Sequence, residues 1–562
     1  MTQQTQGAVK TVSPRIFFII WFLINLIQAS ATGLMDDEAY YWVYSRFLDW
    51  GYFDHPPMTA LMIKAGTLLF PGELGVRFFI VLTNTLTLWI IYKLLQKRND
   101  GLFYLIAAGM AVLQIGGILA VPDLPLVFFI ACFFYVYQQF LRNDSLKNTV
   151  LLGLTMSLML YAKYHGVLVV LFTLASNPSL IKKWQSWLAV MIGAVLFVPH
   201  LVWQYNHGFP SVQYHLFERN APAYKAGFTF EYLGGQLALM GPIIGWLLLW
   251  ASWKYKPTNR FEWALRWNLF GILVFFGIST FKGRVEANWT IPVFVPLIIL
   301  SHQYLTEKTK WWPFLRVSAI ITLVLVLVVR VYMIADIEPL KWVKKDEVHK
   351  NHEWGRVIKE RAAGRPVVFI DSYQEASKYW FYTGDTALSV NTVNYRRNNY
   401  NFWPIEKQFC GRPVLWATRH RDYQKQFPDS LATPRGLYPV YDDPCFYSRM
   451  GDWLDVDVKA SPDGDFLVQQ ARFSSDDAEG SCMPDSSRMQ AFLSDGKRRT
   501  VFLQTDFAAG FGLRDFPLTI HTDLDTNFFP GLQVRYGIPA SAPGIVTLSS
   551  RTVKVEPKKT TE

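Results

Sequence analysis

The chain has 562 residues, of which 51% are hydrophobic and 16% aromatic, while only 18% are charged. This balance excludes a single water-soluble domain, because the apolar residues form repeated long blocks from about residue 16 to residue 334. Beyond that point charged residues, Gly and Pro are mixed, as in a water-soluble domain. The formal net charge of +11 does not indicate nucleic-acid binding, since many Lys and Arg residues fall in short hinges between apolar blocks.

About eleven apolar blocks are expected to span a membrane, whose core takes about 20 apolar residues. The basic residues lie at every second hinge, as the positive-inside rule predicts for cytoplasmic loops. With the N-terminus inside, an odd number of spans puts the tail outside. The two blocks beside Lys163 are short, so they could be tilted, broken or re-entrant. The expected spans are residues 16–34, 76–95, 102–120, 124–141, 149–162, 164–176, 187–203, 235–252, 267–281, 289–305 and 313–334.

The expected fold is an α-helical polytopic membrane protein with a C-terminal extracytoplasmic soluble domain, α/β and then β-rich. Residues 1–336 are expected to form the membrane body, residues 337–450 an α/β region and residues 451–562 a β-rich region. An apolar run that ends at Asp371 and precedes a helix start indicates a strand-to-helix unit. Short apolar stretches divided by Gly, Pro and Asp indicate strands at residues 500–504, 518–521, 532–536 and 545–548.

The first apolar block lacks a small-residue cleavage site and is followed by further spans, so it is expected to be an anchor. The four cysteines are too few for a disulfide scaffold. Cys132 lies within a span. Of Cys410, Cys445 and Cys482 in the tail, one pair can bond in an oxidising compartment, and we expect Cys410 to pair with Cys445.

The first outer hinge, residues 35–75, carries the most informative pattern. Asp36, Asp37 and Glu38 open an aromatic-rich helix directly after the first span. One interpretation is structural: Asp36 or Asp37 caps the helix and Glu38 complements its dipole. The other is functional, because a carboxylate near lipid is costly and marks a site. Residues 58–70 are apolar but too short to span, so a helix at the membrane interface is expected there.

Two further polar residues lie among apolar segments, and each has two interpretations. Asp123, between Pro122 and Pro125, either caps the next helix or belongs to a site. Lys163 either extends to the interface or supplies positive charge to an anion inside the bundle. The other outer hinges carry His207, His215, Glu218, Arg219, Tyr224 and Lys225, and then Lys282, Arg284 and Glu286.

Cofactor signals are few. There is no Walker-type P-loop, no glycine-rich dinucleotide motif and no zinc ribbon, so nucleotide-driven chemistry is not indicated. His207 and His215 lack a tight metal-ligand spacing. Asp54 and His55 offer a carboxylate and an imidazole, which leaves a divalent metal ion open as a cofactor at that point.

Together these motifs resemble the C-type integral-membrane glycosyltransferases of the protein mannosyltransferase and lipid A aminoarabinose transferase family. The resemblance covers roughly residues 10–440. It implies a polyprenyl-phosphate sugar donor and transfer with inversion of the anomeric centre. The segments that carry it are Asp36-Asp37-Glu38-Ala39-Tyr40-Tyr41, Phe53-Asp54-His55-Pro56-Pro57, Val121-Pro122-Asp123-Leu124-Pro125, Lys163-Tyr164, residues 211–219, Arg284-Val285-Glu286-Ala287-Asn288-Trp289, Tyr373-Gln374-Glu375-Ala376-Ser377 and Arg396-Arg397-Asn398-Asn399-Tyr400.

The resemblance implies that Asp37 is the catalytic base and that Asp123 is the second outer-loop aspartate of the family; Glu38 completes the catalytic candidates. A polyprenyl-phosphate leaving group needs cations around it more than a general acid. This chain has Asp54-His55-Pro56 where aminoarabinose transferases carry Glu-Lys-Pro, which leaves the phosphate contact there open. The candidate donor-phosphate ligands are Lys163, Arg219, Lys282, Arg284 and His55.

The expected function is transfer of a sugar from an undecaprenyl-phosphate carrier to a lipid, glycan or protein acceptor. It is expected at the periplasmic face of the bacterial inner membrane. The alternative is a lipid-linked-sugar transporter or flippase with an extracytoplasmic sensor domain. Transporters place ionisable residues near the midplane and often repeat their halves. Here the polar residues lie at span ends and no second half repeats the first, which favours the transferase.

Overall fold

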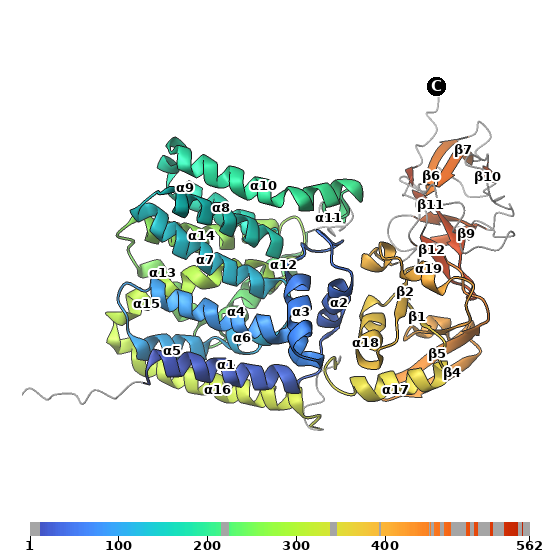
Figure 1. The fold of residues 1–562 in the computed structure, drawn as a ribbon, viewed down its shortest axis with the longest axis horizontal. Helices are drawn as coiled ribbons and strands as arrows, with labels where there is room; N and C mark the ends of the chain where they lie inside the picture. Colours follow the sequence, from blue (N-terminus) through green and yellow to red (C-terminus); the bar gives the residue numbers. More distant parts are fainter. Residues whose placement is uncertain are drawn as a thin grey trace, which may run out of the picture. The chain divides into compact units, whose positions relative to one another are not determined.

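A computed structural model describes residues 12–214, 224–337, 346–392, 395–448, 450, 454–460, 466–473, 490–494, 500–503, 518–520, 533–548 and 553–554. Its contacts divide the chain into two units, Met1–His349 and Lys350–Glu562. The first unit is helical and the second contains the sheets (Figure 1). The domain boundaries predicted after residues 336 and 450 stay predictions.

Gly, Pro and Asp interrupt helices, and in the first unit they cluster mainly in the hinges. The long apolar blocks between the hinges therefore form helices. Within the described residues, seven helices are long and apolar enough to cross a membrane, or up to nine if each of two bent pairs is one span. The helices are α1 (Pro14–Ala31), α2 (Asp36–Arg46), α3 (Met58–Leu69), α4 (Gly72–Leu94), α5 (Asp100–Gly109), α6 (Ala111–Gln114), α7 (Asp123–Arg142), α8 (Leu146–Ala162), α9 (Gly166–Ser176), α10 (Trp184–Asn206), α11 (Pro210–Gln213), α12 (Ala226–Met240), α13 (Gly245–Lys254), α14 (Arg260–Ser279), α15 (Phe294–Thr306) and α16 (Trp312–Ile334), with short 3₁₀ turns η1 (Gly116–Ile118), η2 (Pro178–Lys182), η4 (Ala287–Val293) and η5 (Thr309–Trp311).

The predicted spans meet these helices unevenly. The predicted spans 102–120 and 235–252 fall on the two bent pairs, α5 with residues 111–118 and α12 with α13. The two short blocks beside Lys163 are α8 and α9, which are shorter than the seven long helices. Crossing of the membrane by α8 and α9 stays a prediction. The predicted helix at residues 58–70 is α3.

The two bent pairs meet at their breaks. The axis turns by 83° after α5 and by 91° after α12. A Cβ on Gly109, the last residue of α5, would lie 2.3 Å from a methyl carbon of Ile244, and a Cβ on Gly241 would lie 2.8 Å from the carbonyl oxygen of Gly109. Gly241 also has a φ of 115°, which L side chains rarely adopt. Two glycines therefore allow the two breaks to pack backbone against backbone.

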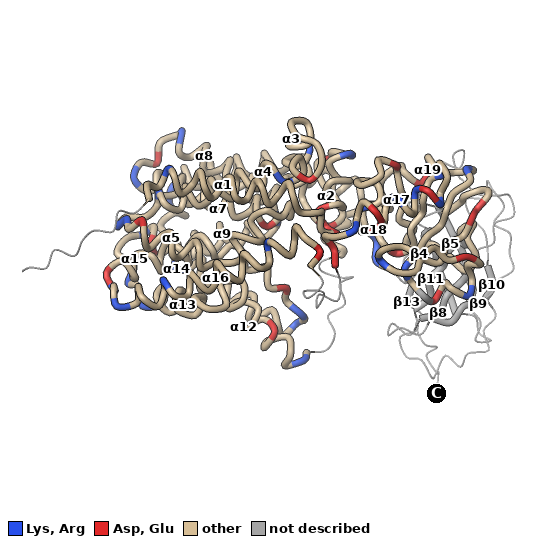
Figure 2. Tube along the Cα trace, turned by 90° about the horizontal axis from the view of Figure 1, so that it is seen from below, with Lys and Arg blue, Asp and Glu red and all other residues tan. Residues whose placement is uncertain are grey.

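The basic hinges lie where α7 ends and α8 begins, and around α5, α13 and α15 (Figure 2). The Lys97 N–H donates to Gln303 Oε1 at 3.2 Å, and the Lys97 ammonium pairs with Glu307. Lys183 pairs with Asp144 at 2.7 Å. Hinges far apart in the sequence thus gather at one end of the helices, as the alternation of basic hinges predicts.

The second unit begins with an α/β sheet of strand order β2-β1-β3-β5-β4, in which β1 is parallel to β2 and β3 while β5 runs antiparallel to β3 and β4. Two further sheets have the orders β10-β7-β6 and β12-β11-β8-β9, with β13 beside β11. The elements are α17 (Asn351–Ala362), β1 (Val367–Ile370), α18 (Tyr373–Thr383), β2 (Ala387–Val390), η7 (Asn399–Asn401), α19 (Ile405–Phe409), β3 (Val414–Ala417), η8 (Arg421–Lys425), β4 (Asp429–Thr433), β5 (Gly436–Asp443), β6 (Leu454–Ala460), β7 (Phe466–Phe473), β8 (Gln490–Ser494), β9 (Thr500–Leu503), β10 (Leu518–Ile520), β11 (Gln533–Pro539), β12 (Val546–Leu548) and β13 (Val553–Lys554).

The predicted fold class, a polytopic helical body followed by a sheet-containing domain, is confirmed. The strand-to-helix unit is β1 and α18, and strands lie at all four apolar stretches predicted near the C-terminus. The predicted disulfide between Cys410 and Cys445 is wrong. Cys410 is disulfide-bonded, whereas Cys445 is a free, exposed thiol. Cys482 lies outside the described residues, and spacing along the chain does not fix which cysteines meet.

Candidate active site

The acidic triplet forms the first turn of α2, but neither aspartate caps it. The N-cap residue is Met35, and its backbone N–H donates to Glu38 Oε2 at 3.0 Å. The N–H of Asp36 donates to Glu347 Oε2, also at 3.0 Å. The carboxylates of Glu38 and Glu347 therefore accept the N–H groups of Met35 and Asp36 at the helix start. The Glu38 contact is the one that the third helical residue makes in a capping box.

Glu38 is fully buried in an ion pair with Arg77 of α4. Arg77 Nε lies 2.7 Å from Glu38 Oε1 and Arg77 Nη2 lies 2.5 Å from Oε2, which is bidentate geometry. The N–H of Ala120 donates to Glu38 Oε1 at 2.8 Å. The guanidinium of Arg77 also donates to the carbonyls of Ala29, Thr32 and Gly33. Glu38 and Arg77 thus join α1, α2, α4 and the segment before α7.

The burial of Glu38 gives it a structural role. Its two oxygens accept four hydrogen bonds away from solvent, so the carboxylate holds the start of α2, and a catalytic role for Glu38 stays a prediction. Asp37 is the preceding residue and is exposed. Successive helix positions point about 100° apart, so fixing Glu38 inward directs Asp37 to another side of the helix.

A second buried pair forms at the start of α7. Lys163 Nζ lies 2.7 Å from Asp123 Oδ1, and each side chain is only 6% exposed. Asn288 Nδ2 donates to Asp123 Oδ2 at 3.1 Å. The anion that Lys163 faces inside the bundle is therefore the carboxylate of Asp123, which joins the ends of α7 and α8 to η4.

The segment before α3 is held against the end of α10 by a polar network. Ser211 Oγ donates to the Phe53 carbonyl at 2.8 Å and accepts from Gln204 Nε2 at 2.8 Å. Gln204 also reaches the hydroxyl of Tyr164 at 3.2 Å. Tyr164 directly follows Lys163, so this network brings the segment of Asp54 beside the Asp123–Lys163 pair.

The aromatic residues of this segment pack closely. The rings of Tyr44 and Tyr52 stack at 4.0 Å, and the Tyr52 hydroxyl donates to the Tyr44 carbonyl at 3.0 Å. Burial raises the pKa of Tyr44 well above its ordinary value, and the nearby Tyr40 and Asp54 act in the same direction. Burial likewise raises the pKa of Tyr52. Both phenols are therefore neutral at physiological pH and serve as packing groups.

The remaining predicted site residues lie in different surroundings. Asp54 is buried and His55 half-buried, with the His55 ring 5.7 Å from that of Tyr41. Lys282 is exposed. Arg284 is 61% exposed and lies 3.4 Å from Glu231, so it faces a carboxylate before any ligand binds. Arg219, together with His215 and Glu218, lies outside the described residues.

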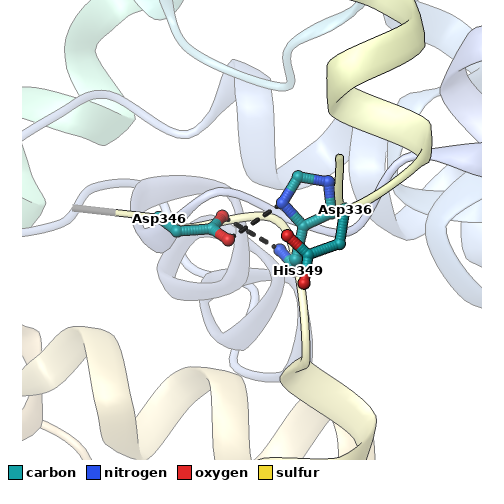
Figure 3. Close-up of side chains that lie close together, drawn as sticks. All are labelled: Asp336, Asp346 and His349. Carbon is teal, nitrogen blue, oxygen red and sulfur yellow. Dashed lines mark hydrogen bonds and ion pairs between the residues drawn. The ribbon is translucent and has the colours of Figure 1, made fainter. Parts of the chain in front are cut away.

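In the part of the chain that the structure describes, Asp54 and His55 are not grouped with a third metal ligand. Among the described residues, the group of three or more His, Cys, Asp or Glu side chains close enough to hold an ion is Asp336, Asp346 and His349, with their ligand atoms within 4.8 Å of one another (Figure 3). Asp54 and His55 do not belong to it. This group lies where the first unit ends, after α16.

Several positioning residues escape sequence reasoning. Arg77 carries a signal that could have found it, because an arginine within an apolar block needs a buried acidic partner. Asn288 lies in a recognised motif but has no charge to single it out. Gln204 and Ser211 gave no sign of bridging two outer hinges, since hydrogen bonds of this kind depend on the fold.

The comparisons with known proteins agree with this architecture. The model of the dolichyl-phosphate-mannose-protein mannosyltransferase family matches residues 54–203. A lipid A galacturonosyltransferase, RgtD of Rhizobium johnstonii, is 25% identical over 323 residues, 54% of this chain and 66% of the relative. An undecaprenyl phosphate-alpha-4-amino-4-deoxy-L-arabinose arabinosyl transferase of Erwinia tasmaniensis is 26% identical over 333 residues, 51% of this chain and 58% of the relative. The chain thus spans less than two thirds of either relative.

Solved structures show the same fold. The crystal structure of apo ArnT from Cupriavidus metallidurans has a TM-score of 0.58 at 14% identity, covering 76% of this chain and 97% of that one. The same ArnT bound to undecaprenyl phosphate has a TM-score of 0.56. The chain therefore shares the fold of ArnT. The partial family-model match, the two relatives and this fold agree with the resemblance to ArnT-like C-type glycosyltransferases that the motifs carry.

Proposed function

We propose that this protein is a membrane glycosyltransferase that moves a sugar from a polyprenyl-phosphate carrier to an acceptor. The observation that carries the proposal is the set of buried contacts that joins the outer hinges. Glu38 binds the N–H of Ala120, and Asp123 binds Lys163. The Gln204–Ser211 network then returns to Phe53. Asp37 is exposed beside this network.

In this reaction Asp37 acts as the general base. It accepts the proton of the attacking hydroxyl or amine while that nucleophile bonds to the anomeric carbon of the donor sugar. The bond from the anomeric carbon to the phosphate oxygen breaks with inversion, and the polyprenyl phosphate leaves with the electron pair. Its charge makes protonation of the leaving group unnecessary.

Cations near the network stabilise the leaving phosphate. Lys163 is the buried candidate: Asp123 and the end of α8 fix its ammonium in a dry position, and a phosphate would share that ammonium with the Asp123 carboxylate. Lys282, Arg284 and His55 are further candidates, and Arg219 belongs to the same proposal. Exposed Arg284 can exchange Glu231 for a phosphate at little cost.

Undecaprenyl phosphate is the carrier that we propose, because one solved ArnT structure is described as bound to it. The names of the two relatives describe transfer to lipid A and use of an undecaprenyl-phosphate donor. A lipid-linked glycan is therefore the first acceptor to test, ahead of other glycans and proteins. The disulfide at Cys410 supports an oxidising, periplasmic location for the tail at the inner membrane.

The test is transfer of label from a panel of undecaprenyl-phosphate sugars into lipid, glycan and protein fractions by the purified chain. Asp37→Asn is expected to lower the initial rate about 10²- to 10⁴-fold, because it removes the base. Asp144→Asn, at the other end of the helices, is the matched control and is expected to keep the wild-type rate. Donor binding without transfer in the wild type would contradict the proposal and favour the transporter.

A further inference from the structure

Two carboxylates and an imidazole converge where the first unit ends. Asp336 follows α16, and Asp346 and His349 come just before α17. Their ligand atoms lie within 4.8 Å of one another, with His349 buried and the two carboxylates exposed. Figure 3 shows the Asp346 carboxylate and the His349 ring facing each other, with Asp336 beside the ring. These residues take no part in the proposed transfer step.

The hydrogen bonds of His349 orient its ring for a further ligand. Nε2 lies 2.7 Å from the Tyr332 carbonyl in the last turn of α16, and a carbonyl only accepts, so Nε2 carries a proton. In the neutral ring the lone pair is then on Nδ1, which lies 2.9 Å from Asp346 Oδ2. Nδ1 and Asp346 Oδ2 therefore face each other as two ligand atoms.

Asp346 is also fixed in place. The N–H groups of Val348 and His349 donate to its Oδ1 at 3.1 and 3.2 Å, which leaves Oδ2 directed at the ring. A metal-bound histidine normally donates its other N–H to a carbonyl or carboxylate, which is the arrangement of His349 and Tyr332. The C-terminal end of α16 adds partial negative charge, which favours a cation there.

We propose that Asp336, Asp346 and His349 bind a divalent transition-metal ion such as Zn²⁺ or Mn²⁺. An imidazole nitrogen with two carboxylates suits these ions better than Ca²⁺ or Mg²⁺, which prefer oxygen ligands. Ligand atoms around Zn²⁺ lie about 3.4 Å apart in a tetrahedral site, and the ligand atoms of the three residues already lie within 4.8 Å of one another. Water supplies the remaining ligands.

The ion would order the segment that holds α2. Glu347 lies between two ligands and accepts the N–H of Asp36, the residue before Asp37. Loss of the ion would loosen this contact and displace the proposed base. This consequence rests on the proposed function, whereas the metal site itself does not.

The experiment measures metal binding without any donor. The full chain, purified with its tag removed, is stripped with a chelator, dialysed against Zn²⁺ or Mn²⁺ and analysed by mass spectrometry of the metal. We expect about one equivalent in the wild type and affinity about 100-fold lower or worse in Asp336→Asn and in His349→Gln. Asp385→Asn and His352→Gln, in the second unit, are the matched controls and are expected to bind as the wild type does.

Thermal unfolding gives a second measure, because an ion that binds only the folded chain raises its midpoint. Zn²⁺ should raise the midpoint of the wild type but not that of Asp336→Asn, in which one ligand is lost at an exposed position. Equal metal binding by the wild type and both site variants, or no binding by the wild type, would overturn the site and leave only the contact between His349 and Asp346.

Glu347→Gln tests the link between the metal site and the reaction. This variant is expected to keep the metal and to lower transfer, so that failure of the metal site and failure of the proposed function can be distinguished.

Discussion

The two ends of the membrane unit use the same kinds of charged residue in opposite surroundings. At the end of the unit that carries α2, the Glu38 and Arg77 side chains are 0% exposed. At the opposite end, which carries the basic hinges, the Lys97 side chain is 60% exposed. Burying an ion has a desolvation penalty of several kcal/mol, while an exposed pair has almost none. The comparison indicates that buried ion pairs occur where the helices must be held in fixed positions. Exposed ion pairs occur where only the positive charge of the hinge matters for the orientation in the membrane.

The largest expected effect is at the buried end. Arg77→Met leaves the Glu38 carboxylate buried without its partner, which is expected to destabilise the fold by about 3–5 kcal/mol and to abolish transfer. Thermal unfolding in detergent and the transfer assay measure the two effects. The double variant Glu38→Gln/Arg77→Met removes both charges and should recover part of the stability. A double variant less stable than Arg77→Met would contradict the pairing.

Lys163→Met tests whether the second buried pair serves the donor. It is expected to lower transfer about 10²- to 10³-fold, because it removes a preorganised cation from the leaving phosphate, and to lower the thermal midpoint, because it leaves the buried Asp123 carboxylate without that partner. Asp123→Asn removes the group that holds Lys163 and should lower transfer less while keeping donor binding. Binding of a labelled undecaprenyl-phosphate sugar separates the two. Unchanged binding and transfer in Lys163→Met would exclude a phosphate contact.

A smaller effect is expected in the second unit. Arg361 donates two hydrogen bonds to Asp442, at 2.9 and 2.6 Å, and together with Arg365 it lowers the pKa of that carboxyl to about 2. Because the folded pKa is below the ordinary value of about 3.9, the contribution is complete above that pH and is lost as pH falls toward 2. Arg361→Gln should therefore lower the thermal midpoint at pH 5 more than at pH 3. The shift is small because Asp442 is 47% exposed.

The smallest effect is expected at the basic hinges. Glu307→Gln breaks the exposed pair with Lys97, and solvent and salt already screen that pair. Stability and transfer should both match the wild type in thermal unfolding and in the label assay. A clear loss of either would show that exposed pairs also fix position, and the contrast between the two ends would fail.

Much of the architecture follows from the sequence because long apolar blocks and basic hinges report membrane spans directly. The positions of Asp123 and Lys163 between apolar blocks were also informative, since such charges need partners. Their mutual pairing was not predictable, because 40 residues separate them and the contact depends on how α7 and α8 pack.

The acidic triplet shows the limit more sharply. Its composition indicates both a helix start and a site, and the fold divides these roles between neighbours. Glu38 turns inward to Arg77, while Asp37 stays exposed. Nothing in the residue types distinguishes them. The three residues of the metal site were missed for a similar reason, because His349 and Asp346 meet Asp336 only through the path of the chain after α16.

The contact between the two helix breaks has a consequence for how such proteins diverge. Gly241 leaves room for the backbone of Gly109, and Gly109 leaves room for the side chain of Ile244, so a side chain gained at either position needs a compensating change in the opposite helix. The two positions are 132 apart in numbering yet should vary together among homologues. We expect a substitution at one of the two positions to be accompanied by a change in where the opposite helix pair bends. Such pairwise covariation would show that the contact constrains both helix pairs.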